Sequence, residues 1–190
     1  MVELGRELQP ESTDGCTGRV VRARGWICTE NLVNTSPSAP HLEFALTISI
    51  NLGKAYFVRP SQYGSERAAV YLLDGTVTGP QINGIVVPNS GGDFPWVRPD
   101  GVIDFDARYL LQTDDGANIY FQSRGYRWGT PEAMAKMARR EPVPDDSYYM
   151  RTVPKFEAPA GRYDWLNRHV FVGRAEKTPE GNRIHYFKVL

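Results

Sequence analysis

The sequence predicts an all-β fold, an antiparallel up-and-down β-barrel with one short helix. After residue 40, apolar and polar residues alternate with a period of two along most of the chain, which is typical of strands with one buried face. The 190 residues also include 18 glycines and 14 prolines, which favours many short elements joined by turns. A β-sandwich fits the same pattern. We prefer the barrel because closing the sheet leaves fewer strand edges to protect.

Nine segments with this alternation are expected to be strands. They do not alternate with helices, as the strands of a parallel βαβ fold would. They are residues 42–51, 54–59, 71–78, 81–87, 102–113, 117–126, 148–156, 168–174 and 185–189. The clearest hairpin joins 102–113 to 117–126 through Asp114, Asp115 and Gly116. Glycine supplies the positive φ that such a turn demands.

One helix is expected to interrupt the strands. Thr130 is a suitable N-cap, Pro131 fits the first helical position, and residues 133–140 are good helix formers. Pro142 and Pro144 are expected to end this helix.

The first 40 residues differ in composition from the rest of the chain. Polar and turn-forming clusters surround one short alternating run at 19–27. We therefore expect two parts. Residues 1–40 form a partly ordered extension that serves as a lid or a dimer contact, and residues 41–190 form a single barrel domain.

The charge balance argues against two classes of partner. Lysine plus arginine number 22 and aspartate plus glutamate number 22, so the formal net charge is zero. Nucleic-acid binding and polybasic membrane binding usually need a basic excess. Only five of the basic residues are lysines, and arginine is suited to partly buried pairing with carboxylates and substrate oxygens. The neutral balance therefore suggests internally paired charge.

The cysteines and histidines give no sign of a metal or cofactor site. Cys16 and Cys28 are expected to be two reduced thiols. His41, His169 and His185 lack zinc-site spacing, so no metal is expected. The N-terminus shows no basic region followed by an apolar one, which together with the thiols predicts a cytoplasmic protein.

The strand at 102–113 carries most of the chemistry. Asp104, Asp106 and Arg108 fall on one of its faces. If this face is solvent-exposed, the pattern is simply polar outside and apolar inside. If it faces the lumen, the three groups form an acid–cation constellation suited to proton transfer or to binding a polar substrate. The next strand adds Tyr120 on one face, and Tyr148, Tyr149 and Arg151 follow later in the chain. The phenol of a tyrosine can donate a hydrogen bond to a developing enolate oxygen.

Several ordered motifs between residues 92 and 167 resemble one family. They are Asp93, Val97-Arg98-Pro99-Asp100-Gly101, Asp106-Ala107-Arg108-Tyr109, Thr113-Asp114-Asp115-Gly116-Ala117, Ile119-Tyr120, Tyr148-Tyr149-Met150-Arg151-Thr152, Pro154, Phe156-Glu157, Tyr163 and Trp165-Leu166-Asn167. Together they resemble the domain of unknown function 3237 family (uncharacterised protein family 0311), over roughly residues 42–190.

The resemblance implies an antiparallel β-barrel with a lipocalin-like interior, and little about activity. Its motifs concentrate on Asp93, Arg98, Asp106, Arg108, Tyr109, Tyr120 and Arg151. The chain departs from the family pattern at one loop, where Asp93 is followed by Phe94 and Pro95, with Trp96 next, instead of an Asp-Trp-Gln-like segment. If this loop lines the pocket mouth, the shape and hydrogen bonding of the mouth are altered here.

The leading functional hypothesis is a cofactor-independent isomerase, cyclase or lyase. It would act by proton transfer on a small apolar, oxygenated compound, polyketide- or phenol-like, inside the barrel. Asp106 or Asp93 would be the base, and Tyr120 or Tyr149 the acid or oxyanion donor. Arg108 and Arg151 would hold the carbonyl or enolate oxygen. The further expected substrate-binding residues are Tyr109, Arg98, Tyr148 and Trp96.

Two other readings stay open. In the first, the barrel is a non-catalytic carrier or sensor of a lipophilic ligand, which needs no desolvated carboxylate beside Arg and Tyr. In the second, the protein is a purely structural subunit, which predicts no pocket larger than a few water molecules. The expected partners are a small-molecule ligand or substrate and, since symmetric dimers are the commonest assembly, a second copy of the chain.

Overall fold

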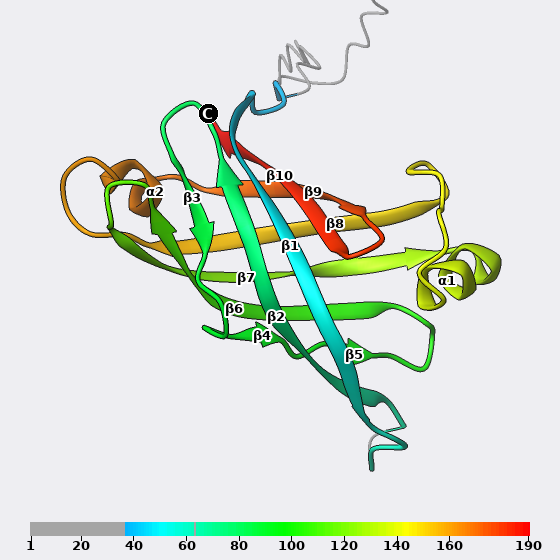
Figure 1. Ribbon diagram of the computed structural model, residues 1–190. Helices are drawn as coiled ribbons and strands as arrows, with labels where there is room; N and C mark the ends of the chain where they lie inside the picture. The colour runs from blue at the N-terminus through cyan, green and yellow to red at the C-terminus, as the bar shows by residue number, and fades with distance from the viewer. Residues whose placement is uncertain (1–36, 63) are drawn as a thin grey trace, which may run out of the picture. The chain divides into compact units, whose positions relative to one another are not determined.

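The computed structural model describes residues 37–62 and 64–190. In this region ten strands form one antiparallel sheet that closes in a ring, with two short helices (Figure 1). The strands are β1 (Leu42–Val58), β2 (Glu66–Thr78), β3 (Asn83–Val86), β4 (Gly92–Asp93), β5 (Trp96–Val97), β6 (Ile103–Thr113), β7 (Asn118–Gly129), β8 (Tyr148–Glu157), β9 (Phe171–Lys177) and β10 (Gly181–Val189). The predicted antiparallel barrel is confirmed.

The order of strands around the ring is β1, β10, β9, β8, β7, β6, β3 and β2, and pairing of β1 with β2 closes it. The short strands β3, β4 and β5 each pair with both β2 and β6. These three segments therefore share one position in a ring of eight. A barrel of this size is wide enough to enclose side chains or one small ligand.

The strand boundaries differ from the sequence prediction in a few places. The two predicted strands 42–51 and 54–59 form the single strand β1, because irregularities beside Leu52 let the chain pass Gly53 without losing its pairing to β2. Strands β4 and β5 were not predicted, since two residues are too few to show a period. The predicted strand at 168–174 begins only at Phe171, because Arg168 ends a helix.

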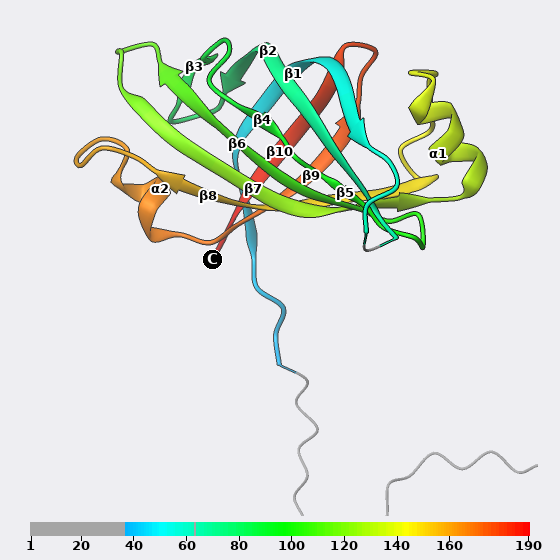
Figure 2. The same cartoon turned by 90° about the horizontal axis from the view of Figure 1, so that it is seen from below.

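The two helices lie at opposite ends of the barrel (Figure 2). Helix α1 (Pro131–Ala138) is the predicted one, and its N-cap Thr130 accepts a hydrogen bond from the backbone N–H of Ala133 at 3.2 Å. Helix α2 (Asp164–Arg168) was not predicted; it buries Leu166. Neither helix in the described ranges is long and apolar enough to cross a membrane. The predicted strand at 19–27, Cys16 and Cys28 lie outside the described residues.

The half of the barrel near α2 is packed with large side chains. Phe121, Phe156, Phe171 and Tyr186 are buried and meet mostly edge to face, with ring centroids 5.2–6.4 Å apart. Gly173 makes room for this cluster, because a Cβ there would lie 2.6 Å from the Tyr186 ring. These rings form the aromatic part of the hydrophobic core, which also includes Phe105 and Met137.

The half near α1 is built differently. Leu52, Phe57 and Val70 line this half, but several other lining positions on β1, β2 and β10 carry small residues: Gly53, Ala55, Ala68 and Gly181. Side chains this short do not fill a ring of eight strands. The sequence therefore leaves a cavity at the α1 end.

Candidate functional site

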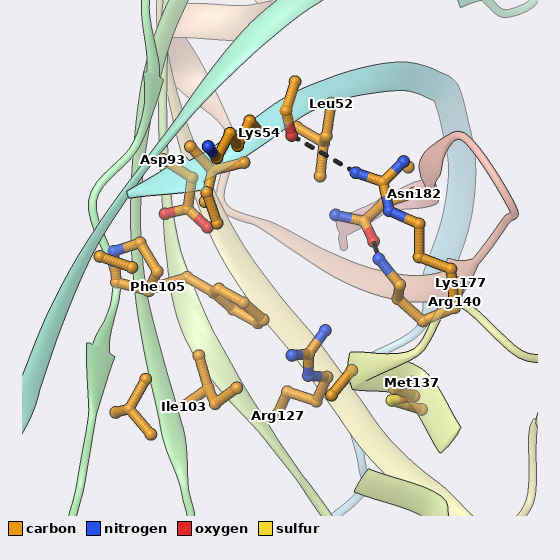
Figure 3. A pocket seen from close by; sticks show the side chains of 18 of the residues that line it. Leu52, Lys54, Asp93, Ile103, Phe105, Arg127, Met137, Arg140, Lys177 and Asn182 are labelled. Carbon is orange, nitrogen blue, oxygen red and sulfur yellow. Dashed lines mark hydrogen bonds between the residues drawn. The ribbon is translucent and has the colours of Figure 1, made fainter. Parts of the chain in front are cut away.

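A cavity of about 790 Å³ occupies the α1 end of the barrel. Inward residues of β1, β2, β6, β7, β9 and β10 form its walls, and Met137 and Arg140, from α1 and the turn after it, also line it (Figure 3). A smaller extension of about 40 Å³ shares Asp93 and Phe105 with it and reaches Tyr109 and Tyr186. The volume suits a small organic molecule.

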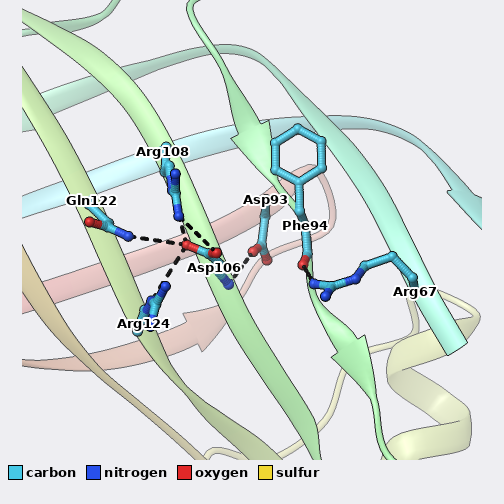
Figure 4. Close-up of polar contacts among 7 residues, drawn as sticks. All are labelled: Arg67, Asp93, Phe94, Asp106, Arg108, Gln122 and Arg124. Atoms are coloured by element: carbon cyan, nitrogen blue, oxygen red, sulfur yellow. Dashed lines mark hydrogen bonds and ion pairs between the residues drawn. The ribbon is translucent and has the colours of Figure 1, made fainter. Parts of the chain in front are cut away.

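Asp93 lies on the cavity wall at the end of β4. Its Oδ1 accepts a hydrogen bond from the backbone N–H of Asp106, 3.0 Å away (Figure 4). Burial raises the pKa of Asp93 to about 6, although that hydrogen bond and the positive charge of Arg127 act in the opposite direction. A carboxyl with this pKa takes and returns protons near neutral pH.

Buried hydroxyl groups lie at the inner end of the cavity. Tyr109 and Tyr186 are almost fully buried, and the Tyr186 Oη is 3.4 Å from the Ser123 Oγ. Burial raises the pKa of Tyr109 well above its usual range, and that of Tyr186 to about 12. Both phenols therefore stay neutral and can donate hydrogen bonds.

Arg127, on β7, extends its guanidinium into the same cavity (Figure 3). The guanidinium carbon lies 5.9 Å from the centroid of the Phe105 ring. Its Nε is buried and has no hydrogen-bond partner in the described part of the chain. Burial lowers the pKa of Arg127, and the carboxylate of Asp93 acts against this, but a guanidinium keeps its proton in proteins. The cavity thus contains a cation with an unsatisfied donor.

Lys177 and Arg140 approach the cavity from the opposite side to Asp93 (Figure 3). The Lys177 Nζ donates a hydrogen bond to the Asn182 Oδ1 at 2.9 Å. Burial, together with the positive charges of Arg127 and Arg140, lowers the pKa of Lys177 to about 8. Arg140 donates a hydrogen bond to the backbone oxygen of Gly53 at 3.5 Å, so it links the turn after α1 to β1.

The acid–cation face of β6 points away from the cavity. Asp106 pairs with Arg108 at 3.2 Å and with Arg124 at 3.7 Å on the outer surface of the sheet (Figure 4). Tyr120 is also on this surface. The solvent-facing reading of this strand is therefore the one the fold adopts. Asp106, Arg108 and Tyr120 do not share a cavity with Asp93.

The other predicted site residues are divided between the two faces. Tyr109 lines the inner end of the cavity. Tyr148 is buried, and its Oη accepts a hydrogen bond from the backbone N–H of Lys177 at 3.1 Å. Tyr149 and Arg151 instead line a groove of about 800 Å³ on the outer surface.

Arg98 and Trp96 lie apart from the cavity. Arg98 is exposed and pairs with Asp100 within its own turn at 2.5 Å. The Arg67 guanidinium stacks over the Trp96 ring, 3.7 Å from its centroid. The loop that follows Asp93 contributes to the site, because Pro95 lines the cavity, while Phe94 is exposed on the outer surface.

Sequence reasoning missed Arg127 and Lys177. Arg127 continues the inward face of β7, which otherwise carries apolar or small residues at Phe121, Ser123 and Gly125. Lys177 likewise continues the inward face of β9 after Phe171, Gly173 and Ala175. A charged residue that continues the buried face of a strand was the available signal. No three His, Cys, Asp or Glu side chains of residues 37–62 and 64–190 gather closely enough to hold a metal ion.

Known proteins resemble this chain over most of its length. A UPF0311 protein of Rhodopseudomonas palustris is 36% identical over 153 residues, which is 80% of this chain and 99% of that protein. Its crystal structure has a TM-score of 0.76 and covers 82% of this chain and 100% of its own. The crystal structure of a beta-barrel like protein from Acinetobacter baumannii has a TM-score of 0.69 at 30% identity, covering 82% and 99% of the two chains.

A more distant relative has a named activity. The hydroalkoxylation enzyme phnH of Penicillium herquei is 27% identical over 158 residues, or 83% of this chain and 89% of that one. The crystal structure of an enzyme from the same organism has a TM-score of 0.62 at 26% identity, covering 82% of this chain and 98% of its own.

The family comparison agrees with these similarities. Residues 40–189 match the family described as "Protein of unknown function (DUF3237)". The match covers the whole barrel, from the start of β1 to the end of β10. The chain therefore belongs to the DUF3237 family, which includes the UPF0311 proteins.

Proposed function

We propose that this protein catalyses an isomerisation, cyclisation or lyase reaction by proton transfer, without a cofactor. Its substrate is a small, mostly apolar, oxygenated compound, phenol- or polyketide-like, held inside the barrel. The observation that carries the proposal is the carboxyl of Asp93, which burial holds at a pKa of about 6 on the wall of a cavity of about 790 Å³. The neighbouring walls, such as Ile103 and Phe105, are apolar and suit a ring system.

The named activity of the Penicillium relative supports this class of reaction. Hydroalkoxylation adds an O–H group across a C=C bond. The O–H bond breaks, a C–O bond forms at one alkene carbon, and the other carbon receives a proton. Within one molecule the product is an isomer of the substrate, and nothing is oxidised or reduced. The protein must supply only a base and then an acid.

In this mechanism Asp93 performs both proton transfers. Its carboxylate accepts the hydroxyl proton, and the neutral acid then returns the proton to carbon. A pKa of about 6 keeps the two forms close in free energy near neutral pH. Tyr109, a neutral phenol at the inner end of the cavity, is placed to donate to a substrate oxygen. The apolar walls hold the substrate in a reactive conformer.

The alternative is a non-catalytic carrier or sensor. An apolar cavity alone would serve such a protein. Asp93 favours the enzyme, because burying a carboxyl beside the cavity costs stability and a carrier of apolar ligands gains nothing from it.

The probe for this proposal is 2′-hydroxychalcone, which cyclises to flavanone by adding its phenol O–H across its own C=C bond. We expect the protein to accelerate this loss of chalcone absorbance, and Asp93→Asn to reduce kcat/KM by about 100-fold or more, the scale of general acid–base catalysis. Asp106→Asn is the matched control on the outer face and should change the rate by less than about twofold. Equal rates for Asp93→Asn and the wild type would overturn the mechanism, and binding without acceleration would favour the carrier.

A further inference from the structure

We propose that the cavity recognises a ligand with a carboxylate group, held by Arg127 together with Lys177 and Arg140, the latter two lying across the cavity from Asp93. The inference deepens the proposed function, on which it rests, by narrowing the substrate to an apolar ring compound that carries one acid group. The reacting hydroxyl would lie at Asp93, and the carboxylate at the three cations.

The charges around the cavity are unequal although the chain as a whole is neutral. Five cationic side chains and three carboxylates line it; they are Lys54, Arg59, Arg127, Arg140, Lys177, Glu66, Asp93 and Glu180. Arg59 and Glu66 pair with each other at 2.6 Å. The remaining four cations face two carboxylates, so the cavity carries an excess of positive charge that attracts an anion.

Arg127 is the strongest single indication of an anionic ligand. Its Nε is buried and has no hydrogen-bond partner among the described residues, and the carboxylate of Asp93 acts on its charge without hydrogen bonding to this nitrogen. Burying a charged donor without an acceptor is costly. A carboxylate entering the cavity would accept two parallel hydrogen bonds from the guanidinium and remove this cost.

Lys177 and Arg140 complete the cation cluster. The Lys177 ammonium has three donors, and Asn182 accepts from one of them. Arg140 makes one long hydrogen bond, to the Gly53 oxygen at 3.5 Å, which leaves most of its donors available to a ligand in the cavity that it lines. The cations repel one another in the empty cavity, and a bound carboxylate would relieve that repulsion.

The placement of Asp93 sets the shape of the ligand. Figure 3 shows its carboxyl across the cavity from Lys177 and Arg140, with Phe105 on the same side as Asp93. A ligand that meets both sides must place its acid group and its reacting hydroxyl at opposite ends of an apolar body. The walls between the two sides include Ile103 and Phe105, which suits an aromatic ring.

The test compares 1-naphthoate with 1-naphthamide, its neutral isostere, by isothermal titration calorimetry on the full chain at pH 7. We expect wild type to bind naphthoate at least about tenfold more tightly, as a charge-assisted hydrogen bond implies. Arg127→Met should abolish this preference while leaving the affinity for naphthamide unchanged, which also shows that the variant is folded. Lys177→Met should reduce the preference in the same direction.

The control is Arg124→Met, because Arg124 lines the outer groove together with Arg151 and Arg174. This variant should prefer naphthoate over naphthamide to the same extent as the wild type. Equal binding of the two probes by the wild type would overturn the inference, as would a preference lost in Arg124→Met but kept in Arg127→Met. Asp93→Asn should keep the preference, so loss of turnover in that variant tests the proposed function separately from the carboxylate site.

Discussion

The backbone N–H of Asp106 donates a hydrogen bond to the side chain of Asp93, 3.0 Å away, while the side chain of Asp106 points to the opposite face of the sheet. The two carboxyls therefore differ sharply in environment. Burial raises the pKa of Asp93 to about 6. Partial burial acts in the same direction on Asp106, but hydrogen bonds from Arg108 and Gln122 outweigh it and lower its pKa. Of these two carboxyl groups, Asp93 is the one suited to exchange protons at neutral pH.

Asp93 is expected to make stability depend on pH. Because its folded pKa is raised from 3.8 to about 6, its favourable contribution is full below pH 3.8 and is lost as the pH rises through about 6. This difference corresponds to about 2–3 kcal/mol. Asp93→Asn should therefore be more stable than the wild type at pH 8 by about this amount, with the difference vanishing near pH 4. Urea unfolding at the two pH values measures it, and an equal effect of Asp106→Asn would contradict the assignment.

Lys177 is expected to react as an amine at unusually low pH. With a pKa of about 8, roughly half of it is neutral at pH 8, whereas a lysine of ordinary pKa is less than about 1% neutral there. Reductive methylation with formaldehyde, followed by peptide mass spectrometry across pH 6–11, should give a midpoint near 8 for Lys177. The exposed Lys155 provides the comparison within the same chain. Identical pH profiles for the two lysines would rule out a lowered pKa.

Filling the cavity should block ligands without unfolding the protein. Ala68 and Ala69 are neighbours on β2, and only Ala68 lines the cavity. Ala68→Phe places a ring in empty space, so we expect at least a tenfold loss of naphthoate affinity with a melting temperature no lower than that of the wild type. Ala69→Phe should bind naphthoate normally. Normal naphthoate binding by Ala68→Phe would show that the ligand does not enter the barrel at this point, and equal weakening in both variants would show that the loss is not specific to the cavity.

The aromatic core should carry much of the stability of the fold. Phe121 is fully buried, and its ring lies 4.7 Å from Tyr109, 5.2 Å from Phe156 and 5.7 Å from Tyr186, centroid to centroid. We expect Phe121→Ala to lower the free energy of unfolding by about 3–5 kcal/mol. Tyr120→Ala, one residue away on the outer face, should cost less than about 1 kcal/mol. Denaturant titration compares the two variants, and similar losses would contradict the assignment of Phe121 to the buried face and Tyr120 to the outer face.

The fold was largely predictable from local patterns. The alternation in residues 102–113 and 117–126 and the turn at Gly116, where φ is +85°, reappear as β6, β7 and their hairpin. The N-cap of α1 at Thr130 was likewise predictable from the sequence. Strands β4 and β5 were not, because two residues that pair between longer strands are selected by tertiary contacts and leave no period in the sequence.

The site was only partly predictable. A period of two separates the residues of a strand into two faces, but it does not say which face is inside when both carry polar groups. Asp104, Asp106 and Arg108 are conspicuous in the sequence and lie outside. Arg127 and Lys177 are inconspicuous, and they lie inside because β7 and β9 bury the faces that contain them. Asp93 was identifiable by type, and its burial depends on pairing between β2, β4 and β6.

The most direct test of the central claim is the pH dependence of 2′-hydroxychalcone cyclisation by the wild type, Asp93→Asn and Asp106→Asn. Because the carboxylate form of Asp93 starts the reaction, kcat/KM should rise about tenfold per pH unit up to about pH 6 and then level off. Asp106→Asn should follow the same curve, and Asp93→Asn should be slow at every pH with no inflection near 6. A wild-type profile without an inflection near pH 6, or one that survives in Asp93→Asn, would contradict the claim that Asp93 is the catalytic base in the barrel.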